Sequence, residues 1–356
     1  MKKTQVAILL AAGALVAGLA SAPTAQAFEP KFVDGVLQPL PDGFPNMPIT
    51  LLNSDEAGSS SGLYIRSLQL ALEGISPVEI RIADEPRAAG GTIHTLAEVT
   101  ESREGGDQGY ILVQGSTIGS ATDFLTEPTE KETGIGIDDV NFFITTEAAP
   151  WVILQRQDAP WGQGFDKFVE YGKAHPGEIK YISPGVGGGL DIFTTWVLDR
   201  LGVKVNKVPA ADREASLSAV GGGAGDITAT NATSALKALD KVDVLLVSIP
   251  EVPETFGGAE VGSASDYPKY GIENLAWGSF QGFILSKKVP EEHVQWLHAL
   301  LSAAAKTDTY AQRAKTTPGV VIGVTSTEAT NAQAHAAKDA AEPIVKAAGL
   351  AWEDNQ

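Results

Sequence analysis

Strand-like and helix-like segments alternate along most of the chain, and this alternation restricts the possible folds more than any other feature. In the first part, strands are predicted at residues 49–52, 78–82 and 110–113, with helices between them at 63–73 and 92–101. This order is typical of β-α-β units, which build largely parallel sheets covered by helices. The sequence therefore predicts an α/β fold.

The same order of elements returns in the middle of the chain. Strands are predicted at residues 151–155, 180–183, 203–208, 226–229 and 242–247. Helices are predicted at residues 164–174, 191–201, 215–220, 291–306 and 326–348. No repeat of fixed period and no long linker interrupts this pattern. A chain of 356 residues is long enough for two domains of about 100–200 residues each.

The first residues have the pattern of a secretory signal peptide. Lys2 and Lys3 precede an apolar run at residues 6–20, and the small-x-small pattern at residues 25–27 predicts cleavage after Ala27. The run is shorter than the about 20 residues that a membrane span needs, although a retained N-terminal anchor is the alternative. The chain has no cysteine, which excludes a lipid anchor on cysteine and any disulfide. We therefore expect export to the periplasm.

The formal net charge of −18 narrows the choice of partners. It becomes two units more negative once Lys2 and Lys3 are removed. Such a charge repels nucleic acid and anionic lipid, so neither is expected as a partner. A small anionic ligand would have to be held by backbone N–H groups or by a few well-placed arginines.

A loop of small residues at positions 55–62 follows the first strand and leads into a helix. The N–H groups at a helix start lack intrahelical partners and carry positive partial charge, which suits a carboxylate or phosphate. The alternative is an ordinary strand-to-helix turn. The candidate ligand-binding residues in this loop are Ala57, Gly58, Ser59, Ser60 and Ser61.

The same loop also matches the G-x-S-x-G pattern of serine hydrolases, through Gly58, Ser60 and Gly62. Against this interpretation, the loop follows the first strand of the mature chain, and no oxyanion loop of the HGGG type is present. The five histidines are typical of surface or structural positions. A secreted esterase that uses Ser60 is kept as an alternative.

A second glycine-rich loop, at residues 183–189, also lies between a strand and a helix. It lacks the third glycine of a dinucleotide-binding fingerprint, because Leu190 stands there, and no Gly-Lys-Ser/Thr of a P-loop follows. The candidate residues are Ser183, Gly185, Gly187, Gly188 and Gly189. A third glycine run, at 221–225, precedes Asp226 and is more typical of a close approach between backbones.

Taken in order, these segments resemble the substrate-binding proteins of tripartite tricarboxylate transporters, also called the Bug family. The resemblance covers nearly all the mature chain. Arg66 stands where the family has an arginine after its first loop, and Trp277-Gly278 also recurs in place. The other matching segments are FPNMPI at 44–49, EPRAAGG at 85–91, QGYIL at 108–112, YISPGVGG at 181–188, GGAGD at 222–226 and IPEVPETF at 249–256.

This resemblance implies a type II periplasmic-binding-protein fold, in which two α/β lobes enclose a ligand cleft and close like a hinge. Residues 1–27 would be the signal peptide, residues 28–147 plus 251–356 lobe 1, and residues 148–250 lobe 2. The function implied is capture of a di- or tricarboxylate or an aromatic acid for the integral-membrane subunits of a transporter, without catalysis or cofactor. The chain is expected to act as a monomer. A ligand receptor for a sensor kinase is the alternative.

We expect one ligand carboxylate to lie against backbone N–H groups of both loops. Ser116 and Thr117 would form part of the wall. Asp226 would meet a ligand ammonium group if the ligand is an amino acid, although a structural role for this residue is the favoured alternative. Arg87 is a candidate for a second carboxylate, and Asp191 stands where the family has a histidine. The other departures from the family are Ser59-Ser60-Ser61 for its glycine run, Gly62 for its aspartate, Gly188 for a serine and Ala210 for a tyrosine.

Overall fold

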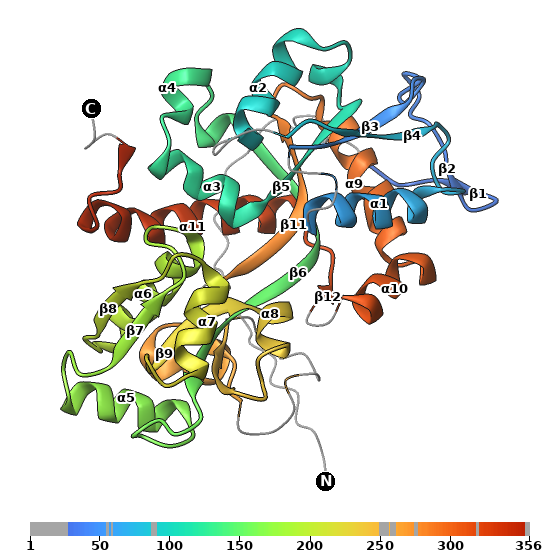
Figure 1. Ribbon diagram of the computed structural model, residues 1–356. Helices are drawn as coiled ribbons and strands as arrows, with labels where there is room; N and C mark the ends of the chain where they lie inside the picture. Colours follow the sequence, from blue (N-terminus) through green and yellow to red (C-terminus); the bar gives the residue numbers. More distant parts are fainter. Residues whose placement is uncertain are drawn as a thin grey trace, which may run out of the picture.

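The computed structural model describes residues 28–54, 57, 60–86, 91–248, 256, 261–273, 277–317 and 320–352. Its main feature is a ten-stranded sheet in which eight strands follow the order β4-β3-β5-β11-β6-β9-β7-β8. Strands β10 and β12 pair with β6, and β1 and β2 form a separate hairpin. Helices cover both ends of this sheet (Figure 1).

The first part of the chain alternates strands and helices as predicted, and it ends in one long strand. Its elements are β1 (Phe32–Val33), β2 (Val36–Leu37), β3 (Ile49–Asn53), α1 (Ser60–Leu72), β4 (Ile80–Asp84), α2 (Gly91–Ser102), η1 (Gly106–Gln108), β5 (Ile111–Ser116), α3 (Thr117–Thr126), α4 (Thr129–Thr133), η2 (Ile137–Asp139) and β6 (Val140–Arg156).

The middle of the chain contains α5 (Phe165–Ala174), β7 (Lys180–Ser183), α6 (Gly189–Leu201), β8 (Asn206–Pro209), α7 (Arg213–Gly221), β9 (Ile227–Asn231), α8 (Ala232–Leu236) and β10 (Val242–Val247). The last part contains η4 (Ala264–Asp266), η5 (Pro268–Tyr270), β11 (Gly278–Ser286), α9 (Glu291–Ala305), α10 (Asp308–Thr316), β12 (Val321–Ile322) and α11 (Thr327–Ala347).

Two groups of parallel strands lie at opposite ends of the sheet. In the first, β3 pairs in parallel with both β4 and β5; in the second, β7 pairs in parallel with both β8 and β9. In the first group, β4 follows β3 on one side and β5 lies on its other side. In the second group, β8 follows β7 on one side and β9 lies on its other side. Each group therefore has a topological switch point at the carboxyl ends of its strands, where open α/β sheets bind ligands.

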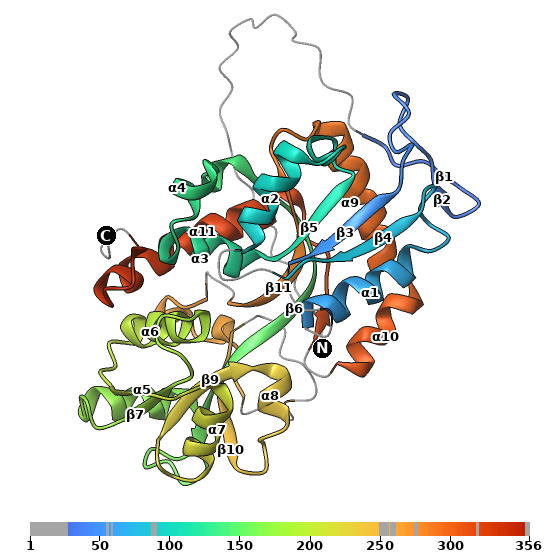
Figure 2. The same ribbon diagram turned by 45° about the horizontal axis from the view of Figure 1, so that its top comes forward.

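Two antiparallel strands, β6 and β11, join the groups (Figure 2). β11 pairs with β5 at one end, through Gln281 opposite Ser116, and β6 pairs with β9 at the other, through Trp151 opposite Asn231. The sequence predicted only residues 151–155 of β6, and it predicted neither β11, α3 nor α10. These are the main elements that local patterns did not reveal.

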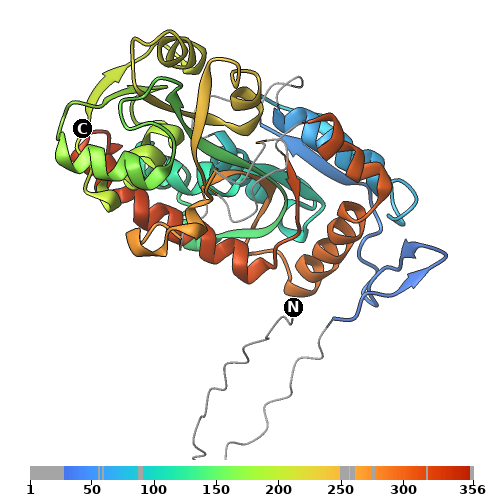
Figure 3. The same cartoon turned by 90° about the horizontal axis from the view of Figure 1, so that it is seen from below.

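The packing of α11 bears on the predicted lobes. This helix packs along α3 and β6, and its later residues Ala337, Ala341 and Val345 join the hydrophobic cluster that also contains α6 (Figures 1 and 3). It therefore contacts a helix next to each group of strands, α3 after β5 and α6 after β7. β6 runs unbroken across the predicted boundary at 147/148, and the boundary at 250/251 lies outside the described residues. The lobe boundaries stay a prediction.

The predicted signal peptide, residues 1–27, lies outside the described residues. Among the helices that the structure describes, none combines the length and the apolar character needed to cross a bilayer.

Candidate functional site

The switch point of the second strand group carries a cavity of about 280 Å³. Three loops meet there: the loop after β7, which leads into α6; the loop after β8, which leads into α7; and the end of β9. The strands β6 and β11 close the cavity from the side of the first group. It is lined by Trp151, Pro184, Gly185, Gly188, Gly189, Leu190, Arg213, Asn231 and Ser279.

The predicted glycine loop forms one wall of this cavity. Gly185 (φ 150°) and Gly187 (φ 77°) adopt backbone conformations that side chains disfavour. Gly189 is glycine for another reason: a Cβ there would lie 2.7 Å from Cη2 of Trp151. Because Gly189 and Leu190 are the first two residues of α6, their N–H groups have no intrahelical partner. These two donors and the helix dipole give the wall positive character.

Two other N–H groups of the loop are already used within it. The Gly188 N–H donates to the Gly185 carbonyl (3.2 Å), and the Gly187 N–H donates to Oδ2 of Asp191 (2.9 Å). Ser183 is fully buried, and its hydroxyl donates to Oδ1 of Asp191 (2.9 Å). Ser183 and Gly187 therefore hold the loop in its conformation, whereas Gly185, Gly188 and Gly189 line the cavity.

Asp191 lies behind the loop and not in the cavity. It is almost completely buried, and its Oδ2 also accepts from Nζ of Lys207 at 2.5 Å. Three donors from three different residues thus converge on one carboxylate. The ion pair with Lys207 offsets its negative charge, which would otherwise repel an anion on the other side of the loop.

The first strand group brings Ser116 and Thr117 close to the same region. Ser116 is the N-cap of α3, and its hydroxyl makes no capping hydrogen bond. It pairs with Gln281 of β11, two residues from Ser279 in the cavity wall. Thr117 is buried, with its hydroxyl 3.1 Å from that of Thr145. Its side chain is therefore engaged within the protein.

The predicted loop at 55–62 is described only in part. Ala57 is exposed, and Ser61 is buried in the first turn of α1. α1 begins at Ser60, so this loop leads into a helix start, as predicted. Gly58, Ser59 and Arg87 lie outside the described residues, as does the side chain of Ser60. Their predicted contacts with a ligand stay predictions.

Asp226 does not lie near the cavity residues. It precedes β9, at the amino ends of the parallel strands, whereas the cavity lies at their carboxyl ends. Its Oδ1 lies 2.9 Å from Nε of Arg156, and its Oδ2 accepts the Lys180 N–H at 2.8 Å. In this structure its carboxylate ties β6, β7 and β9 together.

Six cavity residues were not predicted as binding residues: Trp151, Pro184, Leu190, Arg213, Asn231 and Ser279. Arg213 and Asn231 follow predicted strands, and their position at strand ends was the available signal. Among the described residues that line the cavity, Arg213 is the only ionisable one. Its side chain is 43% exposed, and its Nε lies 3.7 Å from the carboxylate of Glu214, which is itself 73% exposed. This pairing leaves the guanidinium accessible to a ligand.

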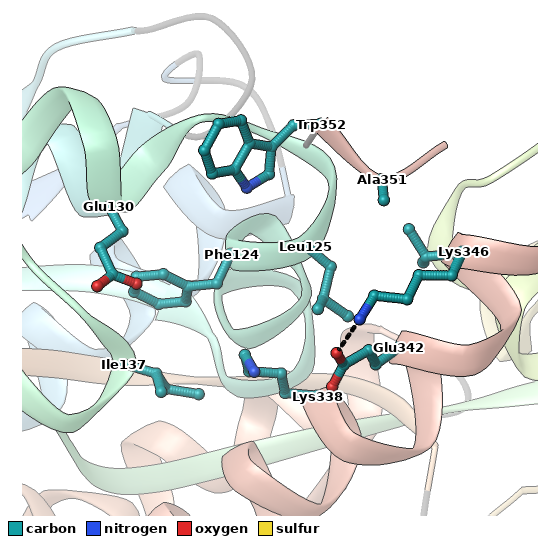
Figure 4. A pocket seen from close by; sticks show the side chains of 10 residues that line it. Phe124, Leu125, Glu130, Ile137, Lys338, Glu342, Lys346, Ala351 and Trp352 are labelled. Carbon is teal, nitrogen blue, oxygen red and sulfur yellow. Dashed lines mark hydrogen bonds and ion pairs between the residues drawn. The ribbon is translucent and has the colours of Figure 1, made fainter. Parts of the chain in front are cut away.

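Other hollows of the described chain lie elsewhere. One, of about 410 Å³, lies behind the glycine loop between α6 and α11, where Asp191 pairs with Lys207. A cavity of about 180 Å³ lies between α3, α4 and the end of α11, where Lys346 pairs with Glu342 (Figure 4). It is away from the carboxyl ends of the strands. Among the described residues, no group of three or more His, Asp or Glu side chains is placed to hold a metal ion.

Comparison with known proteins agrees with this geometry. The sequence profile of the tripartite tricarboxylate transporter family receptor matches residues 70–350. A curated Cupriavidus necator protein, "UPF0065 protein in gbd 5'region", is 25% identical over 182 residues, which are 51% of this chain and 53% of that protein. The match thus spans about half the length of this relative.

Solved structures show the fold. A TctC solute-binding protein from Polaromonas is similar with a TM-score of 0.72 and 20% identity, over 85% of this chain and 99% of that chain. MatC from Rhodopseudomonas palustris, solved with bound malate, gives a TM-score of 0.55 and 19% identity over 85% and 100% of the two chains. The predicted type II periplasmic-binding-protein fold is confirmed.

Proposed function

Since this chain belongs to the tripartite tricarboxylate transporter receptor family, we propose that it captures a small carboxylate in the cavity at the carboxyl ends of β7, β8 and β9. As a member of a family of solute-binding proteins, the chain is not an enzyme, and the esterase alternative through Ser60 is rejected.

One observation carries the proposal: the cavity gathers anion-binding groups in a chain of net charge −18. The helix start at Gly189 and Leu190 offers N–H donors, and Arg213 offers a guanidinium. A carboxylate that accepts such charge-assisted hydrogen bonds gains about 1.5–3 kcal/mol from each. A few of them offset the general repulsion between an anion and an acidic protein.

The dimensions of the cavity favour a small ligand. Its volume of about 280 Å³ lies just below the range of about 300–1,000 Å³ that is typical for drug-sized ligands. Asn231 and Ser279 add neutral hydrogen-bonding groups, and Trp151 adds an apolar surface. The malate bound to MatC is a ligand of this size class and supports the choice of acids as probes.

The proposed setting is the periplasm, where the receptors of this family act. We propose that the signal peptide is removed after Ala27 and that the monomeric receptor passes its ligand to the integral-membrane subunits of a tripartite transporter. A receptor for a sensor kinase would bind its ligand in the same way. Co-purification with the transporter subunits, against co-purification with a kinase, distinguishes these two partners.

The test is a thermal-shift screen of residues 28–356 against succinate, malate, citrate, benzoate and the neutral amides of the same acids. An acid at 100 times its dissociation constant stabilises the folded state by about 2.7 kcal/mol, which raises the melting temperature by several degrees. We expect at least one acid to give this shift and its amide to give none. Equal shifts with acid and amide, or no shift with any acid, would contradict the proposal.

Gly189→Ala is the matching site variant. The added Cβ would meet Trp151 at 2.7 Å, so either the helix start or the indole must move, and we expect binding to fall about tenfold or more. Gly323→Ala is the control, because a Cβ there meets nothing within 4 Å. The control should bind as the wild type does. Wild-type affinity in Gly189→Ala would place the ligand elsewhere.

A further inference from the structure

We infer that Arg213 is the specificity-determining residue of this cavity and that it selects ligands with a second anionic group. The inference rests on the proposed function, since it assigns a role within the same cavity.

The backbone of Arg213 is held firmly. Arg213 is the first residue of α7, and the carboxylate of the N-cap Asp212 accepts the Ala215 N–H at 2.8 Å. The Arg213 carbonyl accepts from the hydroxyl of Ser216 at 2.7 Å. These bonds fix the point from which the side chain extends, so the guanidinium reaches the cavity from a rigid element.

The guanidinium is not engaged in a strong internal pair. Its contact with Glu214 is 3.7 Å long and largely exposed to water, and such pairs contribute about 0–1 kcal/mol. Arg156, by contrast, lies in a 2.9 Å pair with the mostly buried Asp226. Arg213 therefore keeps its donors for a ligand, whereas the guanidinium of Arg156 is held in an ion pair within the protein.

The cavity presents its two positive features on different loops. The N–H groups at the start of α6 follow β7, whereas Arg213 follows β8, the neighbouring strand. A single carboxylate at the helix start would leave the guanidinium without an anionic partner inside the cavity. A ligand with two acidic groups satisfies both features, and the planar guanidinium matches a carboxylate with two parallel hydrogen bonds.

The experiment is isothermal titration calorimetry on residues 28–356 with succinate, malate and the monoamide of each. Succinate and succinamic acid differ by one charge at nearly constant shape, so their affinity ratio reports how the cavity distinguishes the second carboxylate. We expect the wild type to prefer the diacid by about 10- to 100-fold, the ratio that a charge-assisted hydrogen bond of 1.5–3 kcal/mol supplies.

Arg213→Gln should lower diacid affinity by a similar factor and reduce the preference to a few-fold. Arg213→Lys should fall between, because lysine keeps the charge and loses the bidentate geometry. Arg200→Gln is the control: Arg200 lies on α6 outside the cavity, over the ring of Trp196. Diacid affinity should also fall more steeply with salt in the wild type than in Arg213→Gln.

The outcomes separate the two proposals. If the wild type binds neither the diacids nor the monoamides, this inference fails, and the proposed function fails with it only if citrate and benzoate also give no thermal shift. If the wild type binds the diacids and Arg213→Gln keeps both their affinity and their preference, only the role of Arg213 is refuted. An unchanged melting temperature of the ligand-free variant, expected for an exposed side chain, shows that the loss is not one of folding.

Discussion

Replacing Asp191 by alanine tests whether the glycine loop is held from behind. The substitution removes the shared acceptor of the Ser183 hydroxyl, the Gly187 N–H and the Lys207 ammonium. Ser183 is fully buried, so its hydroxyl cannot turn to water. Lys207 is about one-third exposed, so its ammonium group can rehydrate, and the loss of its ion pair contributes less to the destabilisation.

The magnitude follows from these three contacts. A buried donor left without a partner costs about 1–3 kcal/mol, and breaking a buried ion pair costs about 3–5 kcal/mol. Because Lys207 recovers part of its hydration, we expect Asp191→Ala to lower the free energy of unfolding by about 2–4 kcal/mol. Asp191→Asn keeps one acceptor and the shape of the side chain, so its loss should be smaller.

The assay combines urea unfolding with calorimetric binding of the acid that shifts the melting temperature most. We expect Asp191→Ala to weaken binding at least tenfold, because the loop loses the contacts that orient it. Asp199→Ala is the control, since Asp199 lies on the same helix with an exposed side chain. If Asp191→Ala unfolds within 0.5 kcal/mol of the control and binds the acid equally well, the loop does not depend on Asp191.

Two further predictions concern buried charges. Glu147→Gln breaks the buried pair with Arg313, so urea unfolding should show a loss of about 3–5 kcal/mol, and a loss below 1 kcal/mol would contradict this. Burial raises the pKa of Asp123 to about 7, with a smaller effect of Glu127. The folded state then holds this proton more tightly than the unfolded state, so stability falls as the pH rises from about 4 to 7. Asp123→Asn should therefore be more stable than the wild type at pH 8.5, on the order of 2 kcal/mol, with a smaller difference at pH 5; the reverse order in urea unfolding would refute the assignment.

The sequence predicted the elements whose pattern is local and left out those that depend on distant partners. The part of β6 that was not predicted contains Glu147 and Pro150, which interrupt an apolar strand pattern. Glu147 is tolerated there only because Arg313 pairs with it from α10, 166 residues away. β11 likewise owes its place to β5 and β6, both remote in sequence.

In the site, too, the residues with a local pattern could be predicted and those that depend on distant partners could not. The glycine loop after β7 could be predicted, because small residues between a strand and a helix are a local signal. Arg213 follows a predicted strand, but its place beside that loop depends on β8 pairing next to β7, which no local pattern indicates. Asp226 shows the opposite case: its glycine-rich surroundings resemble a ligand loop, but it precedes a strand and so lies at the other edge of the sheet.

The most direct test of the account is a map of the glycine amides on binding. Mature protein labelled with ¹⁵N-glycine would be titrated with the acid that gives the largest thermal shift, and the amide resonances assigned by single substitutions. We predict that the resonances of Gly185, Gly188 and Gly189 move with the titration, whereas those of Gly323 and Gly349 stay in place. Saturation by an acid that leaves all three loop resonances unchanged would contradict it.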